Sequence, residues 1–159
     1  MIYIDGSCLS HGLPDSRAGI GIYWGPNDER NRGLRINEVT SPRVELHAAR
    51  YAIKQARNQG IKSIVLRTDS SYLCNAANEW LEVWRRKGWK LSNRKPVKNL
   101  DLLLDLESQL KDMDVTFEWV QGHSGDTGNE NAHELAQLGA KSPFLEDLDN
   151  AFDPTQARS

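Results

Sequence analysis

The segment SIVLRTDSSY at residues 63–72 indicates the fold more clearly than any other part of the chain. Branched and apolar residues dominate its first part, which predicts a buried strand over residues 63–68. Asp69 and the two serines after it interrupt that pattern and begin a helix that is predicted to continue to residue 84. The segment is therefore a strand that leads through an aspartate into a helix.

The residues before this strand predict a sheet and then a long helix. Alternating apolar positions and a turn at residues 25–28 indicate three antiparallel strands, at residues 2–7, 19–24 and 34–39. Ser41 is expected to cap a helix that has Pro42 at its first position, and an apolar stripe continues to Gly60. A strand–helix–strand unit follows from this order.

The residues after the central segment predict two more helices and one more strand. These elements are expected at residues 100–110, 115–120 and 127–139, and Thr127 with Glu130 fits a capping box. The sequence therefore predicts an α/β domain with a mixed five-stranded sheet, three antiparallel strands followed by two parallel ones, flanked by helices. Because crossover connections are right-handed, strand 63–68 should lie beside the first strand, which brings Asp5 close to Asp69.

Length and composition favour a single soluble domain. The chain has 159 residues, and a chain of this size buries roughly 70% of its unfolded surface without help from disulfides. Cys8 and Cys74 suit a reducing compartment, although one pair of cysteines also permits a bridge. No signal peptide and no membrane span are evident, so an intracellular location, cytoplasmic or nuclear, is expected.

Charge is segregated along the chain although the net charge is only −2. Residues 83–100 carry seven basic side chains and no acidic ones, and Trp80, Trp84 and Trp89 interleave with them. A solvated charged loop is the plain interpretation of such a run, whereas a nucleic-acid contact is the functional one. The residues from 142 to 159 are expected to form an acidic, flexible tail after a domain at residues 1–141.

Five segments resemble, in order and in spacing, the motifs of type 1 ribonuclease H: YIDGS (3–7), VELHAA (44–49), TDSSY (68–72), GHSG (122–125) and GNENAHELA (128–136). The resemblance covers residues 1–141. It implies a ribonuclease H fold and an endonuclease that hydrolyses the RNA strand of RNA–DNA hybrids. The reaction would leave 5′-phosphate and 3′-hydroxyl ends.

The resemblance also implies a metal site. Asp5, Glu45 and Asp69 match the carboxylates that hold two Mg²⁺ ions in this family. Where the usual pattern GNE-x-A-D has an aspartate, this sequence has His133. Three interpretations of this position are open. In the first, His133 binds the second ion as a neutral imidazole and favours Mn²⁺ over Mg²⁺. In the second, Glu130 replaces it from one helical turn earlier, and in the third the protein is a weak or inactive hybrid-binding module.

Further residues take their expected roles from the same resemblance. His123 matches a histidine that assists proton transfer near the leaving group. Contacts to the RNA strand are expected near Ser7, Cys8 and Ser41, since Pro42 stands where a polar amide is usual. Contacts to the DNA strand are expected from the following residues: Thr40, Tyr72, Trp80, Trp84, Arg85, Arg86, Lys87 and Asn99.

Two other interpretations of the whole chain stay open. Besides the endonuclease, the chain could be a hybrid-binding domain without turnover or the ribonuclease H domain of a reverse transcriptase polyprotein. A monomer without membrane contact is expected in each case.

Overall fold

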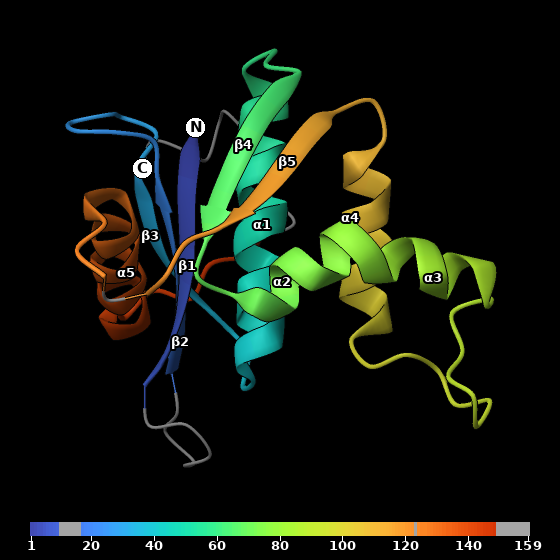
Figure 1. Ribbon diagram of the computed structural model, residues 1–159. Coiled ribbons are helices and arrows are strands. Elements are labelled where there is room, and N and C mark those ends of the chain that lie inside the picture. The colour runs from blue at the N-terminus through green and yellow to red at the C-terminus, as the bar shows by residue number, and fades with distance from the viewer. Residues whose placement is uncertain (10–16, 123, 149–159) are drawn as a thin grey trace.

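The computed structural model describes residues 1–9, 17–122 and 124–148 (Figure 1). Its elements follow in this order: β1 (Ile2–Leu9), β2 (Arg17–Tyr23), β3 (Arg32–Ile36), α1 (Ser41–Asn58), β4 (Ser63–Thr68), α2 (Ser71–Asn75), η1 (Ala76–Trp80), α3 (Leu81–Arg86), α4 (Leu100–Leu110), β5 (Asp114–Trp119) and α5 (Thr127–Lys141). The element η1 is a π-helical turn between two short α-helices.

The strands form one mixed sheet in the order β3-β2-β1-β4-β5. β1 pairs with β2, and β2 with β3, in antiparallel fashion, whereas β4 is parallel to both β1 and β5. This arrangement confirms the predicted fold class. The long α1 crossover places β4 directly beside β1, because parallel neighbours need a connection that returns the chain to the same end of the sheet.

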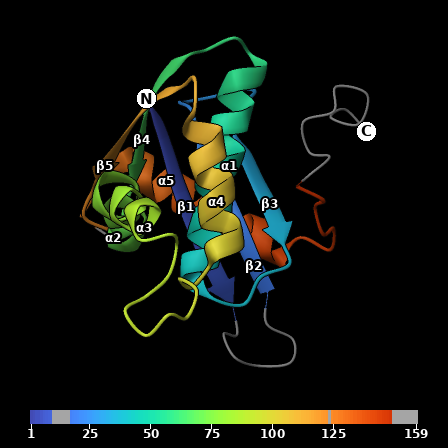
Figure 2. The same ribbon diagram turned by 90° about the vertical axis from the view of Figure 1, so that its right-hand side faces the viewer.

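Helices cover both faces of the sheet (Figure 1), and Figure 2 shows α4 lying on the outer side of α1. The alternation along β1 divides its side chains between the two faces. Ile2 and Ile4 are fully buried in the core that α1 completes, whereas the Tyr3 ring lies against Gly128 of α5. Asp5, two positions after Tyr3, shares the α5 side and reaches His133 of that helix.

Glycines allow α5 to lie unusually close to the sheet. A Cβ atom on Gly21 of β2 would stand 2.0 Å from the carbonyl oxygen of Ala132, and one on Gly33 of β3 would stand 2.3 Å from that of Leu135. Only a hydrogen atom fits at these positions. The glycine-rich pattern of residues 19–21 therefore sets the distance of α5, and with it the position of His133.

The structure corrects four local expectations. The third strand is Arg32–Ile36 and not residues 34–39, because residues 32–36 are the ones that pair with β2. The predicted helix over residues 69–84 is divided by η1. The N-cap of α1 is Thr40 and not Ser41, and that of α5 is Asp126, whose side chain accepts a hydrogen bond from the Asn129 backbone N–H.

The residues after α5 run along the open edge of the sheet as far as residue 148. The Glu146 backbone N–H donates to the carbonyl oxygen of Arg35 at 2.9 Å, and the Arg35 guanidinium donates to that of Ser142. Residues 142–148 thus occupy an edge of β3 that would otherwise offer unpaired backbone groups. Of the tail expected at residues 142–159, residues 142–148 are described and make these contacts, and residues 149–159 lie outside the described residues.

Candidate metal and nucleic-acid site

Three carboxylates from β1, α1 and the end of β4 meet at one place. Asp5 lies on β1, Glu45 in the second turn of α1, and Asp69 directly after β4. Each offers an oxygen atom, and these three atoms all lie within 4.8 Å of one another. The tertiary structure thus confirms the predicted acidic cluster, which draws on residues separated by up to 64 positions.

The cluster is electrostatically unfavourable as it stands. Asp5 is only 2% exposed, and its burial, followed by the charge of Asp69, raises its pKa from 3.8 to about 6. Hydrogen bonds from His133 and from the Gly6 backbone N–H oppose that rise. Burial raises the pKa of Glu45 well above its usual value, and the charges of Asp5 and Asp69 raise it further.

One oxygen of Glu45 is left without a partner. Its Oε2 is buried and accepts no hydrogen bond from any residue that the structure describes. A buried carboxylate oxygen without a donor costs free energy unless a cation or a proton compensates. Hard divalent cations prefer oxygen ligands, and several carboxylates together supply them, so the residues present fit a divalent metal ion.

Two glycines and a tryptophan shape the cluster, and none of the three was predicted as a site residue from the sequence. A Cβ atom on Gly6 would lie 2.7 Å from Cγ1 of Val44, and one on Gly122 would lie 2.8 Å from Oδ2 of Asp69. The indole N–H of Trp119, at the end of β5, donates to the backbone oxygen of Asp69 at 3.2 Å. Its position in the sequence was the signal that could have identified Trp119. The carboxyl ends of neighbouring parallel strands lie together, so Trp119 at the end of β5 comes beside Thr68 at the end of β4.

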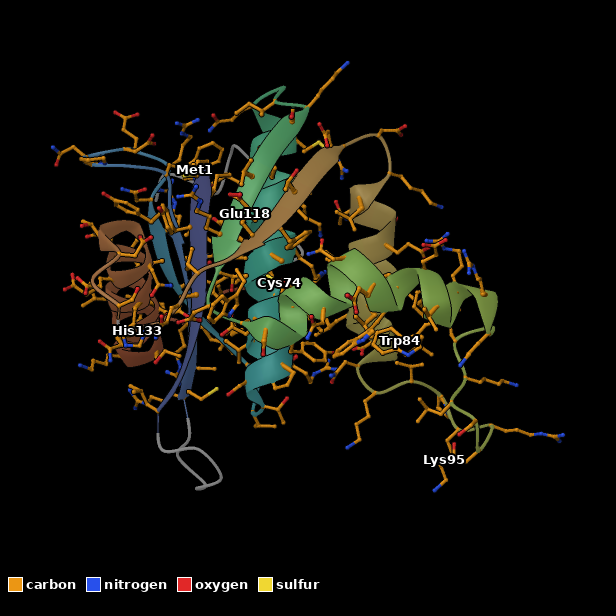
Figure 3. The ribbon with its side chains drawn as sticks, in the orientation of Figure 1. Met1, Cys74, Trp84, Lys95, Glu118 and His133 are labelled. Carbon is orange, nitrogen blue, oxygen red and sulfur yellow. The ribbon has the colours of Figure 1, made fainter. Side chains whose placement is uncertain are left out.

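His133 lies beside the cluster rather than inside it. Its Nδ1 is 2.8 Å from Oδ2 of Asp5 (Figure 3 labels His133 on α5), but among the described residues the set of mutually close ligand atoms consists of the three carboxylates and does not include His133. His133 as a metal ligand stays a prediction. His123 lies outside the described residues, and Glu130 is exposed one turn before His133.

Two of the side chains expected near the RNA strand, Cys8 and Ser41, lie close to Glu45. Burial raises the pKa of the Cys8 thiol, a hydrogen bond with Ser41 opposes that rise, and the Glu45 charge adds to it. Ser7 is buried at the preceding position of β1. Cys8, Ser41 and Glu45 therefore share one neighbourhood, and both Cys8 and Cys74 are free thiols.

Most of the side chains expected near the DNA strand lie along α2, η1 and α3. The ring centroids of Tyr72 and Trp80 are 5.8 Å apart, and those of Trp80 and Trp84 are 5.6 Å apart. Asn99 donates from its side chain to the Tyr72 hydroxyl at 3.2 Å. Figure 3 shows Trp84 at the α3 end of this row and Lys95 at the far end of the loop that follows.

Two of the predicted basic contacts already have acidic partners. Arg85 pairs with Glu107 of α4, and Arg86 pairs with Glu82 one turn earlier. Lys87 is exposed at the end of α3. Thr40 and Asn99 are the N-caps of α1 and α4, whose first turns are joined by Arg43 donating to both oxygens of Asp101 at 2.9 and 2.8 Å.

Fold and site together define a class of protein. Carboxylates that converge from two neighbouring strands and one helix of a mixed sheet are the arrangement of an α/β domain that binds divalent metal ions for phosphodiester chemistry.

Comparison with known proteins supports and narrows this class. The RNase H family model matches residues 1–141. Ribonuclease H1 of Homo sapiens is 44% identical over 142 residues, which are 89% of this chain and 50% of the human protein. Ribonuclease H of Escherichia coli O9:H4 is 36% identical over 146 residues, 92% of each protein. The chain thus belongs to the ribonuclease H family.

A solved structure shows the same fold. The foamy viral protease–reverse transcriptase in complex with an RNA/DNA hybrid superimposes with a TM-score of 0.72 and 24% identity, covering 88% of this chain and 20% of the viral one. The chain spans about half the length of the mammalian relatives that it matches. Within the part of the chain that the structure describes, no helix is both long and apolar enough to cross a membrane.

Proposed function

We propose that this protein is an endonuclease that hydrolyses the RNA strand of RNA–DNA hybrids and leaves 5′-phosphate and 3′-hydroxyl ends. The observation that carries the proposal is the cluster of Asp5, Glu45 and Asp69, with its unpartnered Glu45 oxygen, in a chain of the ribonuclease H family. The bacterial ribonuclease H that matches over 92% of its own length supports it. The viral relative was solved with an RNA/DNA hybrid, which supports the substrate class.

Asp5, Glu45 and Asp69 are the residues that would hold two divalent ions, Mg²⁺ or Mn²⁺. Such ions supply Lewis-acid charge that favours deprotonation of an attacking water and stabilises the leaving oxygen. The protein's own part is positional. The Gly6 N–H fixes Oδ1 of Asp5, His133 fixes its Oδ2, and Trp119 holds the backbone of Asp69.

His123 is proposed as the group that holds or delivers a proton near the leaving oxygen. The DNA strand is proposed to lie along Tyr72, Trp80 and Trp84, with Thr40 and Asn99 near one phosphate. The RNA strand would pass Ser7, Cys8 and Ser41, and the last two of these lie near Glu45. The protein is further proposed to act as an intracellular monomer.

His133 is proposed to bind the second ion as a neutral imidazole. An imidazole nitrogen suits Mn²⁺ better than Mg²⁺, and the site has one negative charge fewer than a fourth carboxylate would supply. We expect His133→Asp to raise the cleavage rate in Mg²⁺ by about ten-fold or more, and to raise it less in Mn²⁺. Initial rates on a labelled hybrid in each metal measure this, and equal or lower activity in Mg²⁺ would contradict it.

The decisive experiment is cleavage of a hybrid labelled on the RNA strand, in Mg²⁺ and in Mn²⁺, by the wild type and by Asp5→Asn. Cleavage by the wild type and its loss in the variant are expected. The matched control is Asp112→Asn, which neutralises an exposed carboxylate in a turn whose left-handed backbone asparagine tolerates. Cleavage that persists in Asp5→Asn would overturn the site.

The second candidate function is a hybrid-binding domain without turnover, which His133 beside Asp5 favours. Wild type that binds the hybrid but cleaves it in neither metal would establish it. The reverse transcriptase alternative concerns the larger protein around this domain and predicts the same chemistry.

A further inference from the structure

The π-helical turn η1 interrupts the helical segment that links the acidic cluster to the basic loop. Its diagnostic contact is the backbone N–H of Leu81, which donates to the carbonyl oxygen of Ala76, five residues earlier. Such turns insert one extra residue into an α-helix, are rare, and occur frequently at functional sites. Nothing in the composition of residues 76–80 requires one, since two alanines there favour an ordinary helix.

The extra residue changes which side chains share a face. In an uninterrupted α-helix, the eight positions from Tyr72 to Trp80 would leave the two rings about 80° apart around the axis. One inserted residue takes back about 100° of rotation, so Trp80 comes nearly into line with Tyr72. The observed ring contact of 5.8 Å between them agrees with this alignment.

The third ring needs no such correction. Trp84 follows Trp80 by four residues, the ordinary spacing of neighbours on a helix face, and their centroids are 5.6 Å apart. The π turn therefore converts one pair of rings into a continuous row of Tyr72, Trp80 and Trp84, which we call the aromatic row. Without the turn, Tyr72 would lie on a different face from the two tryptophans.

The ends of the aromatic row connect two parts of the proposed site. Tyr72 lies three residues after Asp69, and its hydroxyl accepts a hydrogen bond from Asn99, the N-cap of α4. At the other end the backbone N–H of Trp89 donates to the carbonyl oxygen of Trp84, and the exposed basic side chains of Lys87 and Lys90 flank this point. All three rings are partly exposed.

We propose that the π turn Ala76–Trp80 is a positioning device. It aligns the aromatic row so that successive sugars and bases of the DNA strand pack on it between the acidic cluster and the basic loop. This inference rests on the proposed function and adds to it. It assigns a role to backbone geometry, whereas the resemblance concerns side chains only. Stacking on aromatic faces contributes about 1–3 kcal/mol per base, so misaligned rings should weaken binding measurably.

The test moves Trp80 out of line with Tyr72. The variant inserts one alanine after Ala77, which rotates Trp80 and Trp84 by about 100° relative to Tyr72. The control variant deletes Ala77 and inserts one alanine after Arg86, because seven positions of an ordinary helix leave Trp80 about 20° from Tyr72, as the π turn does. We expect the Kd for an uncleavable hybrid to rise roughly 5- to 100-fold in the insertion variant and to change by less than about three-fold in the control, whereas kcat at saturating hybrid stays within about three-fold in both. Mn²⁺ affinity measured by calorimetry should be unchanged, because Asp69 precedes the altered segment.

Point variants keep the test decisive if the insertion variant does not fold. Trp80→Leu removes the central ring and should raise Kd to a similar extent, whereas Val83→Ala, at an exposed apolar residue of α3 outside the row, should not. Unchanged Kd in a folded insertion variant, or equal effects of Trp80→Leu and Val83→Ala, would overturn the inference. A wild type that neither binds nor cleaves hybrids would instead overturn the proposed function on which it rests.

Discussion

Asp5 has a carboxylate whose environment disfavours its own charge. Burial and the neighbouring Asp69 raise its pKa to about 6, against 3.8 for the free side chain. The folded protein therefore binds a proton at Asp5 more tightly than the unfolded chain does. By linkage, this residue costs stability above pH 6, and the cost disappears as the pH falls through 6 toward 4.

We therefore expect metal-free Asp5→Asn to be more stable than the wild type at pH 7, by about 1–3 kcal/mol. The difference should shrink near pH 5 and vanish near pH 3, below both pKa values, where Asp5 is protonated in the folded and the unfolded state. Urea unfolding in a chelator at the three pH values measures it. A difference that does not change with pH would contradict the linkage.

Metal should reverse the order of the two proteins. Mg²⁺ or Mn²⁺ binds the folded wild type and raises its stability by mass action, whereas the variant has lost a ligand. Failure of both ions to stabilise the wild type at millimolar concentration would count against the metal site itself.

At the scale of elements, the contact of α5 with the sheet depends on glycines that no side chain can replace. Gly21 of β2 faces the backbone of Ala132, and Gly139 of α5 faces the backbone of Leu34. Backbone atoms cannot rotate away as a side chain can, so an added methyl group must displace the helix.

We expect Gly21→Ala to lower the free energy of unfolding by about 2–4 kcal/mol, because α5 must move outward. The same movement should carry His133 away from Asp5 and reduce activity. Thermal unfolding and cleavage rates measure the two effects. Leu138→Ala is the control, since Leu138 is 65% exposed on the same helix and its truncation should cost under about 0.5 kcal/mol. Equal effects of the two substitutions would refute the close-packing argument.

A second contact between elements joins α1 to α4. Arg43 pairs with Asp101, Arg50 with Asp105, and Arg57 with Gln109. The three arginines recur every seven residues along one face of α1, while their partners recur every four along α4. This row of pairs fixes the start of α4, where Asn99 meets Tyr72, and so links the core to the proposed DNA contact.

At the scale of the whole molecule, charge is divided in space. Three acidic side chains are drawn into the cluster, while the loop after α3 carries exposed basic side chains outward (Figure 3). The exposed basic side chains are the following: Lys87, Lys90, Arg94, Lys95 and Lys98. The net charge of the protein therefore says little about which molecule it binds, because the electrostatic field near each part of the surface depends mainly on the charged side chains of that part.

The salt dependence of hybrid binding should separate free from paired basic residues. Each phosphate contact adds roughly one unit to the slope of log affinity against log salt, so Lys90→Ala with Lys95→Ala should reduce the slope by about two. Arg86→Ala should reduce the slope by well under one, because Glu82 already pairs with that guanidinium. Affinity titrations over a range of KCl concentrations measure the slopes. A reduction of about one in Arg86→Ala, the value for a free basic contact, would show that the ion pair opens on binding.

How much the sequence foretold differs from element to element. The strand at residues 63–68 and the helix after Ser41 were predicted nearly to the residue, because apolar periodicity and caps are local properties. The helix over residues 69–84 was predicted as continuous, since a π turn depends on the packing of Ala76 and Leu81 and leaves no local signature. The contact between β3 and residues 142–148 was missed for the same reason.

By itself, the sequence determined the order of strands and helices, the family resemblance and the identity of the three carboxylates. Only the tertiary structure decided their relation in space. It brought the three oxygens within 4.8 Å of one another, left one Glu45 oxygen without a donor, and set His133 against Asp5 through the glycine contacts of α5. Periodicity arises from neighbours along the chain, whereas distance, burial and pKa depend on residues that folding brings together from remote positions.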